Sequence, residues 1–111
     1  MPISWEDFEK IDIRTGTILR AETFPEARKP AYRLWIDFGP ERGILTSSAQ
    51  ITTHYQVADL PGRTIIAIVN FPPKQIANFM SQCLVLGVYD ETNAVILLRP
   101  DLPVGNGRAI G

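Results

Sequence analysis

The sequence has one histidine, one cysteine and no excess of positive charge. A single histidine, His54, excludes a histidine-rich metal site. A single cysteine, Cys83, excludes a disulfide within the chain and suits a reducing compartment. Eleven lysines and arginines against twelve acids give a net charge of −1, which differs from the strongly basic balance of a general nucleic-acid binder. Any nucleic-acid site must therefore be a local basic patch.

Long hydrophobic segments are also missing. The apolar run Ile65–Val69 is far shorter than the ~20 residues that a membrane-spanning helix needs. Residues 1–9 are acidic and lack the apolar core of a signal peptide. We therefore expect a cytoplasmic protein without a membrane partner.

The length and composition are those of one globular domain. The chain has 111 residues, of which 45% are hydrophobic and 21% charged, a balance typical of folded proteins. No linker, repeat or low-complexity segment divides it, so we expect a single domain over residues 1–111.

Short segments with strand-like alternation are separated by turns. In the clearest, Leu34 and Ile36 lie on one face and Trp35 on the other. Gly16, inside the first strand, predicts a bend or bulge. Strands are predicted over residues 11–17, 32–38, 44–46, 64–70, 83–89 and 94–98, with short helices over 4–10, 49–51 and 75–79. Short strands, close turns and a helix between the third and fourth strands predict an all-β fold, a five-stranded Greek-key barrel of the OB type.

Some predicted strands are apolar on both faces, whereas a small barrel buries only one. Ile65 and Ile66, for example, are neighbours that point to opposite sides. The same holds for the strands over 83–89 and 94–98. The outer apolar set must be covered, either by the N-terminal helix through Trp5 and Phe8 or by a second copy of the chain. Because most soluble oligomers are twofold dimers, we expect a homodimer.

Candidates for catalysis are few. Cys83 and His54 could form a thiol–imidazole pair, but Cys83 lies in an apolar run where its pKa should rise. The acid pairs Glu6–Asp7 and Asp90–Glu91 consist of adjacent residues that face different ways, which makes them poor acid–base partners. The string Gly105–Gly107 lacks the strand-to-helix context of a phosphate loop. We expect no enzymatic activity, no metal and no cofactor.

Basic residues gather on the first two strands and their loops. In OB folds this face and the first loop commonly bind oligonucleotides, and Trp35 offers a surface on which a base could stack. The alternative is an ordinary mixed surface with a packed tryptophan, because charge runs usually mean solvation. The residues concerned are Arg14, Arg20, Arg28, Lys29, Arg33 and Arg42.

Four strings resemble a known family. Ile11–Ile18 resembles the D-I-R-x-G-x-I opening of tRNA-binding domains, and Pro25–Tyr32, Ser47–Thr52 and Asn70–Ile76 are similar to the CsaA-type chaperone branch. The resemblance covers nearly the whole chain. It implies an OB fold with short helical additions, a homodimer, tRNA binding and a chaperone role for exported preproteins, without a nucleotide or metal.

Two binding hypotheses follow. In the first, tRNA phosphates contact basic side chains, while two polar side chains hydrogen-bond a sugar or base; these residues are Arg14, Arg28, Lys29 and Arg33, with Asn70 and Ser81. In the second, a pocket binds unfolded preproteins or peptides through Trp35, Phe71, Pro72 and Phe79. One alternative is a purely peptide-binding export chaperone with little or no RNA binding. Another is an assembly factor whose apolar face binds only itself.

Overall fold

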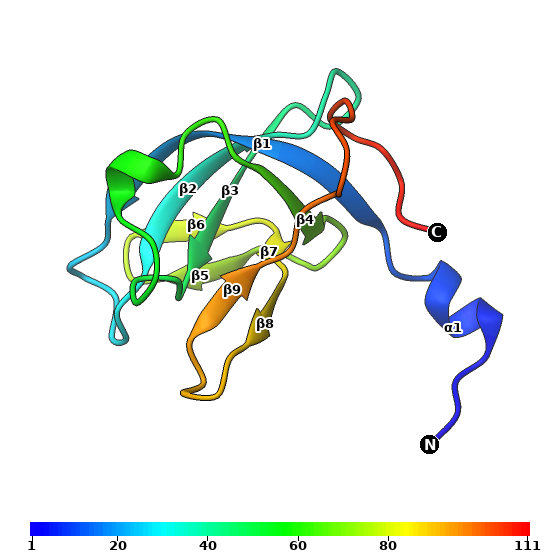
Figure 1. Ribbon diagram of the computed structural model, residues 1–111, viewed down its shortest axis with the longest axis horizontal. Helices are drawn as coiled ribbons and strands as arrows, with labels where there is room; N and C mark the ends of the chain where they lie inside the picture. The colour runs from blue at the N-terminus through cyan, green and yellow to red at the C-terminus, as the bar shows by residue number, and fades with distance from the viewer.

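A five-stranded antiparallel sheet curls into a nearly closed barrel (Figure 1). The computed structural model describes all 111 residues. In the order β3-β2-β1-β4-β7, the strands of the sheet are Ile44–Ala49, Tyr32–Asp37, Ile13–Thr23, Thr64–Ile68 and Leu84–Val85. Two hairpins extend it, β5 (Lys74–Ile76) with β6 (Phe79–Ser81), and β8 (Gly87–Tyr89) with β9 (Val95–Leu97). The prediction of an all-β fold built on a five-stranded OB-type barrel is confirmed.

Strand β1 is the longest and serves two neighbours. Its first half pairs with β4, from Ile13↔Ile68 to Thr17↔Thr64, and its second half pairs with β2. The irregularity lies after Ile18, where Leu19 has no partner in β2, and not at Gly16 as the sequence predicted. Gly16 has a different role. A Cβ there would lie 2.8 Å from the Ile36 side chain, so the glycine allows β2 to pack closely over β1.

The core lies inside the barrel and follows the alternation of β2 and β4. Leu34 and Ile36 are fully buried, as predicted, and so are Ile65 and Ala67. Leu60 adds a fully buried side chain to the core from the chain between β3 and β4. The remaining core residues are Ile18, Phe38, Ala49, Ile51 and Cys83.

No ladder joins β3 to β7, and hydrogen bonds from side chains and one backbone group complete the barrel there. The Ser47 hydroxyl donates to the Cys83 carbonyl at 2.9 Å, and the Gln82 backbone N–H donates to the Thr46 carbonyl at 2.8 Å. The Gln82 side-chain oxygen in turn accepts from the Thr46 backbone N–H at 2.9 Å. The edge of β3 is thus covered by the chain that leads into β7, which prevents it from pairing with another molecule.

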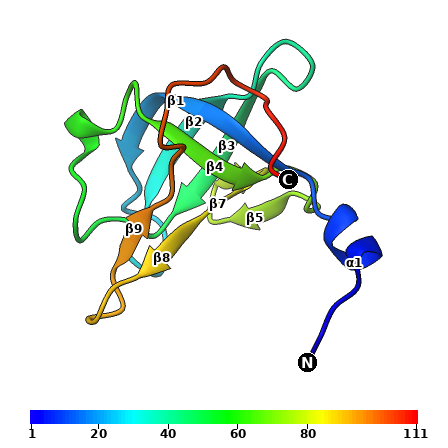
Figure 2. The same ribbon diagram turned by 45° about the vertical axis from the view of Figure 1, so that its right-hand side comes forward.

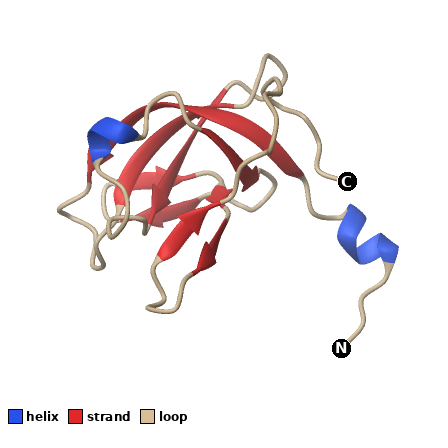
Figure 3. Ribbon diagram, viewed as in Figure 1, coloured by secondary structure: helices blue, strands red, loops and turns tan.

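The helices agree with the prediction only at the N-terminus (Figure 3). Helix α1 spans Trp5–Glu9, and Ser4 caps it by accepting from the Asp7 backbone N–H at 3.1 Å. The helix predicted over 49–51 is wrong, because Ser47–Ala49 pair with β2 as the end of β3. A single 3-10 turn, η1 (Val57–Asp59), follows instead.

The helical turn predicted over 75–79 is also wrong. These residues form the β5–β6 hairpin, in which Ile76 pairs with Phe79 across the turn. Ala77 begins the turn with a φ of 50°, which is unfavourable for a residue with a Cβ.

The C-terminal tail runs beside the first half of β1, along the edge that β2 leaves open (Figure 2). The Thr15 backbone N–H donates to the Arg108 carbonyl at 3.0 Å, and Gly107 donates to the Thr15 carbonyl at 2.7 Å. Gly107 has a φ of 78°, and a Cβ there would lie 2.4 Å from the Phe38 carbonyl oxygen, so only glycine fits. The tail therefore completes the hydrogen bonding of β1.

Helix α1 projects from the barrel and leaves the outer apolar strands uncovered (Figure 1). Its Trp5 is 82% exposed. Leu84, Val88 and Tyr89 on β7 and β8 are exposed as well. The alternative that the N-terminal helix of the same chain covers these strands is therefore wrong. The structure contains no helix with the length and apolar character needed to cross a membrane.

Candidate nucleic-acid interface

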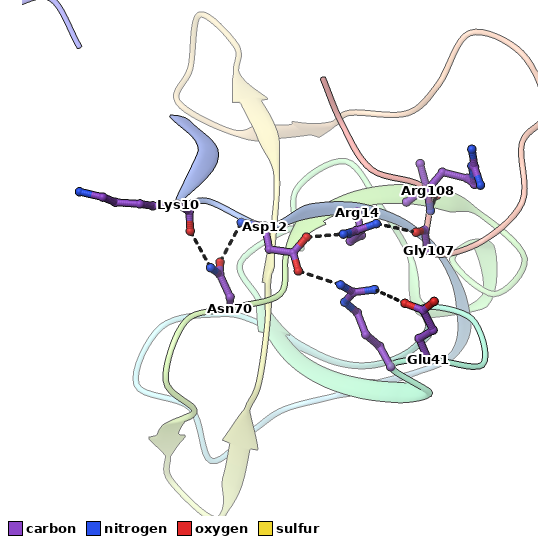
Figure 4. A network of polar contacts seen from close by, with 9 residues as sticks. Lys10, Asp12, Arg14, Glu41, Asn70, Gly107 and Arg108 are labelled. Carbon is purple, nitrogen blue, oxygen red and sulfur yellow. Dashed lines mark hydrogen bonds and ion pairs between the residues drawn. The ribbon is translucent and has the colours of Figure 1, made fainter. Parts of the chain in front are cut away.

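Arg14 is part of a network of polar contacts at the start of β1 (Figure 4). Asp12 accepts from Arg14 Nε at 2.6 Å and from Arg42 Nη2 at 2.9 Å, and Arg14 Nη1 donates to the Gly107 carbonyl at 3.2 Å. Partial burial works to raise the pKa of Asp12, but the hydrogen bonds from Arg14 and Arg42 outweigh it and lower that pKa. Arg14 thus holds the C-terminal tail, and its charge is compensated by Asp12.

Asn70 and Ser81 are also engaged with the protein itself. Asn70 Oδ1 accepts from the Asp12 backbone N–H at 3.0 Å, and its Nδ2 donates to the Lys10 carbonyl at 2.7 Å. Ser81 Oγ accepts from the Ser48 backbone N–H at 3.0 Å, on the edge of β3. Both side chains satisfy backbone groups that no neighbouring strand reaches.

Arg33 lies on the outer face of β2 and pairs with β1. Its Nη2 is 3.2 Å from Glu22 Oε1, and its Nε donates to the Thr23 carbonyl at 3.2 Å. Arg20 forms an ion pair with the same Glu22. The Arg20 guanidinium also lies over the Trp35 ring, 4.4 Å from its centroid. Both guanidiniums on the outer face of these strands are therefore paired with the one carboxylate of Glu22, and one face of Trp35 is covered.

The aromatic residues proposed for peptide binding fall into two places. Phe79 from β6 makes edge-to-face contacts with Phe24, at 5.6 Å between ring centroids, and with Trp35, at 5.7 Å. Phe71 and Pro72 lie outside this cluster, in the connection from β4 to β5, where Phe71 is 52% exposed. The cluster fixes the β5–β6 hairpin against β2, and Phe71 remains the accessible aromatic side chain.

The other two basic residues predicted to bind RNA, Arg28 and Lys29, have no acidic partner in the protein. Arg28 and Lys29 are exposed in the β1–β2 connection and make no ion pair within 4 Å. Together with the β5–β6 hairpin they line a groove of about 780 Å³, which also contains Lys74. We call it the hairpin groove. Ala31, Ser48 and Gln50, at the adjoining ends of β2 and β3, also line it.

Lys74 was missed by the sequence prediction. It begins β5 directly after Pro72-Pro73, where the sequence indicated a break followed by a helical turn. Only the hairpin brings Lys74 back against the β1–β2 connection. The groove thus has three unpaired cations and one acid, Glu26, on a protein whose net charge is −1. This local excess makes the groove the best site for an anionic ligand.

The thiol and the imidazole do not form a catalytic pair. Burial raises the pKa of Cys83 to about 12, although a hydrogen bond involving Ser47 opposes this shift. His54 Nε2 instead contacts Asp90 Oδ2 at 2.6 Å, on the turn between β8 and β9. No three His, Cys, Asp or Glu side chains gather in a way that could hold a metal ion.

An OB-type barrel with a cationic groove beside its first loop belongs to the oligonucleotide-binding class of β-barrels. The sequence matches the family described as "Putative tRNA binding domain" over residues 13–109. The chain belongs to this tRNA-binding domain family, and within it to the CsaA-type branch.

Two solved structures carry the assignment to that branch. The crystal structure of chaperone CsaA from Bacillus anthracis is 50% identical, with a TM-score of 0.93 and complete coverage of both chains. That of the CsaA chaperone protein from Picrophilus torridus is 51% identical, also with a TM-score of 0.93, over 99% of this chain and 100% of that chain.

Related sequences also occur within larger enzymes. The methionine–tRNA ligase of Methanococcus aeolicus is 35% identical over 94% of this chain. The chain spans only 15% of the length of that ligase.

Proposed function

We propose that this protein is a non-catalytic tRNA-binding module that works in the cytoplasm and binds tRNA through the hairpin groove. One observation carries the proposal: Arg28, Lys29 and Lys74 line the same groove, and none of them forms an ion pair within the protein. Ammonium and guanidinium groups bind phosphate oxygens, and such contacts dominate the affinity for nucleic acids. Ser48 and Gln50, which also line the groove, provide polar atoms for a sugar or base.

The proposal predicts binding that is local and electrostatic. Each phosphate contact on a single strand contributes about 0.7 to the slope of log affinity against log salt concentration. Replacing Arg28, Lys29 and Lys74 together by alanine should therefore lower this slope by roughly 2. A filter-binding titration with tRNA at several salt concentrations measures it. Equal slopes for the triple variant and the unmodified protein would place the tRNA site elsewhere.

A chaperone role is supported by the similarity of this chain to two CsaA chaperones and by the exposed aromatic side chain of Phe71. We propose that unfolded preproteins bind near Phe71, beside Pro72, which cannot donate a backbone hydrogen bond. Such apolar contacts depend little on salt, in contrast to phosphate contacts. Phe71→Ala should weaken binding of an unfolded protein and leave the tRNA salt slope unchanged. An unchanged affinity for the unfolded protein would contradict this role for Phe71.

We further propose a homodimer whose interface covers the outer faces of β7 and β8. Leu84 and Val88 are 47% and 50% exposed there, and Tyr89 is 75% exposed. A stable interface usually buries about 1,600 Å² in total. Light scattering should give the dimer mass for the unmodified protein and the monomer mass for Val88→Asp. A monomer mass for the unmodified protein at micromolar concentration would contradict the proposal.

A further inference from the structure

Six lysine and arginine side chains form no ion pair within the protein, and five of these six line two clefts. Five other basic side chains, Lys10, Arg14, Arg20, Arg33 and Arg42, pair with Asp or Glu. Three of the unpaired cations line the hairpin groove. Two more, Arg63 and Arg99, line a second cleft of about 570 Å³. Arg108 is the sixth and lines neither cleft.

We propose that this second cleft, which we call the arginine cleft, binds a phosphate of the same RNA that occupies the hairpin groove. The cleft lies between the segment after η1 and the segment that follows β9, and Tyr55, Thr64 and Asp101 also line it. The inference rests on the proposed tRNA binding and extends it from one site to two.

Arg63 is held in place by its own backbone and side chain. Its backbone N–H donates to the Leu60 carbonyl at 3.1 Å, and its carbonyl accepts from the Ile18 N–H at 2.9 Å, so the residue is tied to two fully buried positions. Its Nε donates to the Asp59 carbonyl at 3.1 Å. This leaves the two terminal nitrogens of the guanidinium without a hydrogen-bond partner in the protein. An arginine fixed in this way loses little freedom when its terminal nitrogens bind a phosphate.

Tyr55 forms a rigid wall on which Arg63 rests. The Arg63 guanidinium lies 5.1 Å from the centroid of the Tyr55 ring. The Tyr55 hydroxyl accepts from the Leu97 backbone N–H at 3.0 Å, and its carbonyl accepts from the Tyr32 hydroxyl at 2.7 Å. Because the guanidinium covers the ring, a base cannot stack on that face. The cleft therefore suits the phosphate backbone of a nucleic acid.

The two clefts lie on either side of one short segment. Gln50 lines the hairpin groove and Tyr55 lines the arginine cleft. Five residues of fully extended chain span at most about 18 Å, so the clefts are no further apart than that at this point. The start of β2 and the chain leading to η1 are also joined directly, because the Tyr32 hydroxyl donates to the Tyr55 carbonyl at 2.7 Å. A single OB fold usually covers about 4–16 nucleotides, which is enough RNA to reach both clefts.

The charge of the cleft agrees with this ligand. Two arginines face one acid, Asp101, and neither arginine forms an ion pair with it. A local positive excess on a protein of net charge −1 favours a polyanion that extends from the hairpin groove.

The test compares three variants in tRNA titrations between 50 and 200 mM salt. Arg63→Ala combined with Arg99→Ala should lower the salt slope by about 1.4, so that the affinity loss over this range becomes roughly sevenfold smaller. Arg108→Ala removes an unpaired arginine outside both clefts and should leave the slope unchanged. Arg99 makes no hydrogen bond within the protein, so Arg99→Ala alone should lower the slope by about 0.7 without affecting folding.

The outcomes separate this inference from the proposed function. If the arginine-cleft variants keep the full slope while the triple variant of the hairpin groove loses its share, the arginine cleft does not bind RNA and the proposed function stands. If the unmodified protein does not bind tRNA at all, both are wrong. Inorganic phosphate and a mononucleotide serve as separate probes. Saturable binding of either that depends on Arg63, with an unchanged tRNA slope, would show that the cleft binds a free phosphate compound and would overturn the inference.

Discussion

The arginines on strands β1 and β2 and the basic residues of the hairpin groove have the same charge but different surroundings. Arg14 and Arg33 each contact a carboxylate and a backbone carbonyl. Arg28 and Lys29 lie between them in the sequence, close to Arg33, and their side chains contact neither. A basic residue that already has a partner stabilises the fold, whereas one without a partner is available to a ligand. The two regions therefore differ in function, and the amino-acid composition does not reveal this difference.

The largest expected effect is a loss of stability when the ion pairs of Arg14 and Arg42 with Asp12 are removed. Asp12→Ala removes the carboxylate that Arg14 and Arg42 share, which leaves Arg14 with only the Gly107 carbonyl and Arg42 with only the exposed Glu41. Breaking a buried ion pair costs about 3–5 kcal/mol, and we expect about 3 kcal/mol here because Asp12 is 28% exposed. Chemical denaturation measures the loss. Glu41→Ala is the matched control, because Glu41 is 85% exposed, and it should change stability little. A loss of tRNA binding without a loss of stability would reverse the assignment of this region.

Phe79 connects the two regions, since it packs on β2 and fixes the hairpin that carries Lys74. We expect Phe79→Ala to lower the free energy of unfolding by about 2 kcal/mol, less than the 3–5 kcal/mol of a fully buried phenylalanine. Thermal unfolding measures the loss, and Met80→Ala, at an exposed neighbour, is the control. A stable variant that has lost binding of an unfolded protein would instead place Phe79 in a peptide site, as the sequence suggested.

Ala77 lies in the wall of the hairpin groove and has a φ of 50°. Ala77→Gly should stabilise the protein by about 0.5–1 kcal/mol, because the relief of a left-handed conformation exceeds the entropy that glycine loses on folding. Asn93, with a φ of 63°, is the control, since asparagine tolerates this conformation and Asn93→Gly should gain less. A destabilised Ala77→Gly protein would show that the turn is not strained. The tRNA salt slope should be unchanged, because no charge is altered.

The smallest effect concerns Asp90, a paired acid that lines neither cleft. The hydrogen bond with His54, and others from Thr92 and Ala94, lower the pKa of Asp90 below its ordinary value near 3.9. A lowered native pKa stabilises the protein above pH 4, and this contribution is lost as the pH falls further. Asp90→Asn should therefore have a lower melting temperature than the unmodified protein at pH 7, and the gap should narrow at pH 3. Glu91→Gln is the control. A gap that widens towards pH 3 would contradict the assignment.

The barrel could be predicted from the sequence because its strands follow a period of two. Leu34 and Ile36 were placed in the core from this alternation alone, and the structure buries both. The prediction of a helix over 49–51 was wrong. Serine often caps helices, but here Ser47 and Ser48 pair with β2 as part of a strand, which the local sequence does not reveal.

The binding site was less predictable for a physical reason. A sequence shows which residues are charged, but not which of them have partners in the fold. Asp12, which compensates Arg14, is a close neighbour in sequence, yet Arg42 and Gly107 join the same network from distant positions. Lys74 likewise reaches the groove only because a hairpin replaces the expected helical turn. Tertiary contacts over long sequence separations thus determine which cations stay open.

One measurement tests the central claim that open cations bind tRNA and paired ones do not. It compares the salt slope of tRNA affinity for two double variants, Arg28→Ala with Lys29→Ala, and Arg20→Ala with Arg33→Ala. Each removes two positive charges from a protein of net charge −1, so the overall charge is the same in both. The account predicts a slope lower by about 1.4 for the first variant and an unchanged slope for the second. Equal reductions in both, or a reduction only in the second, would contradict it.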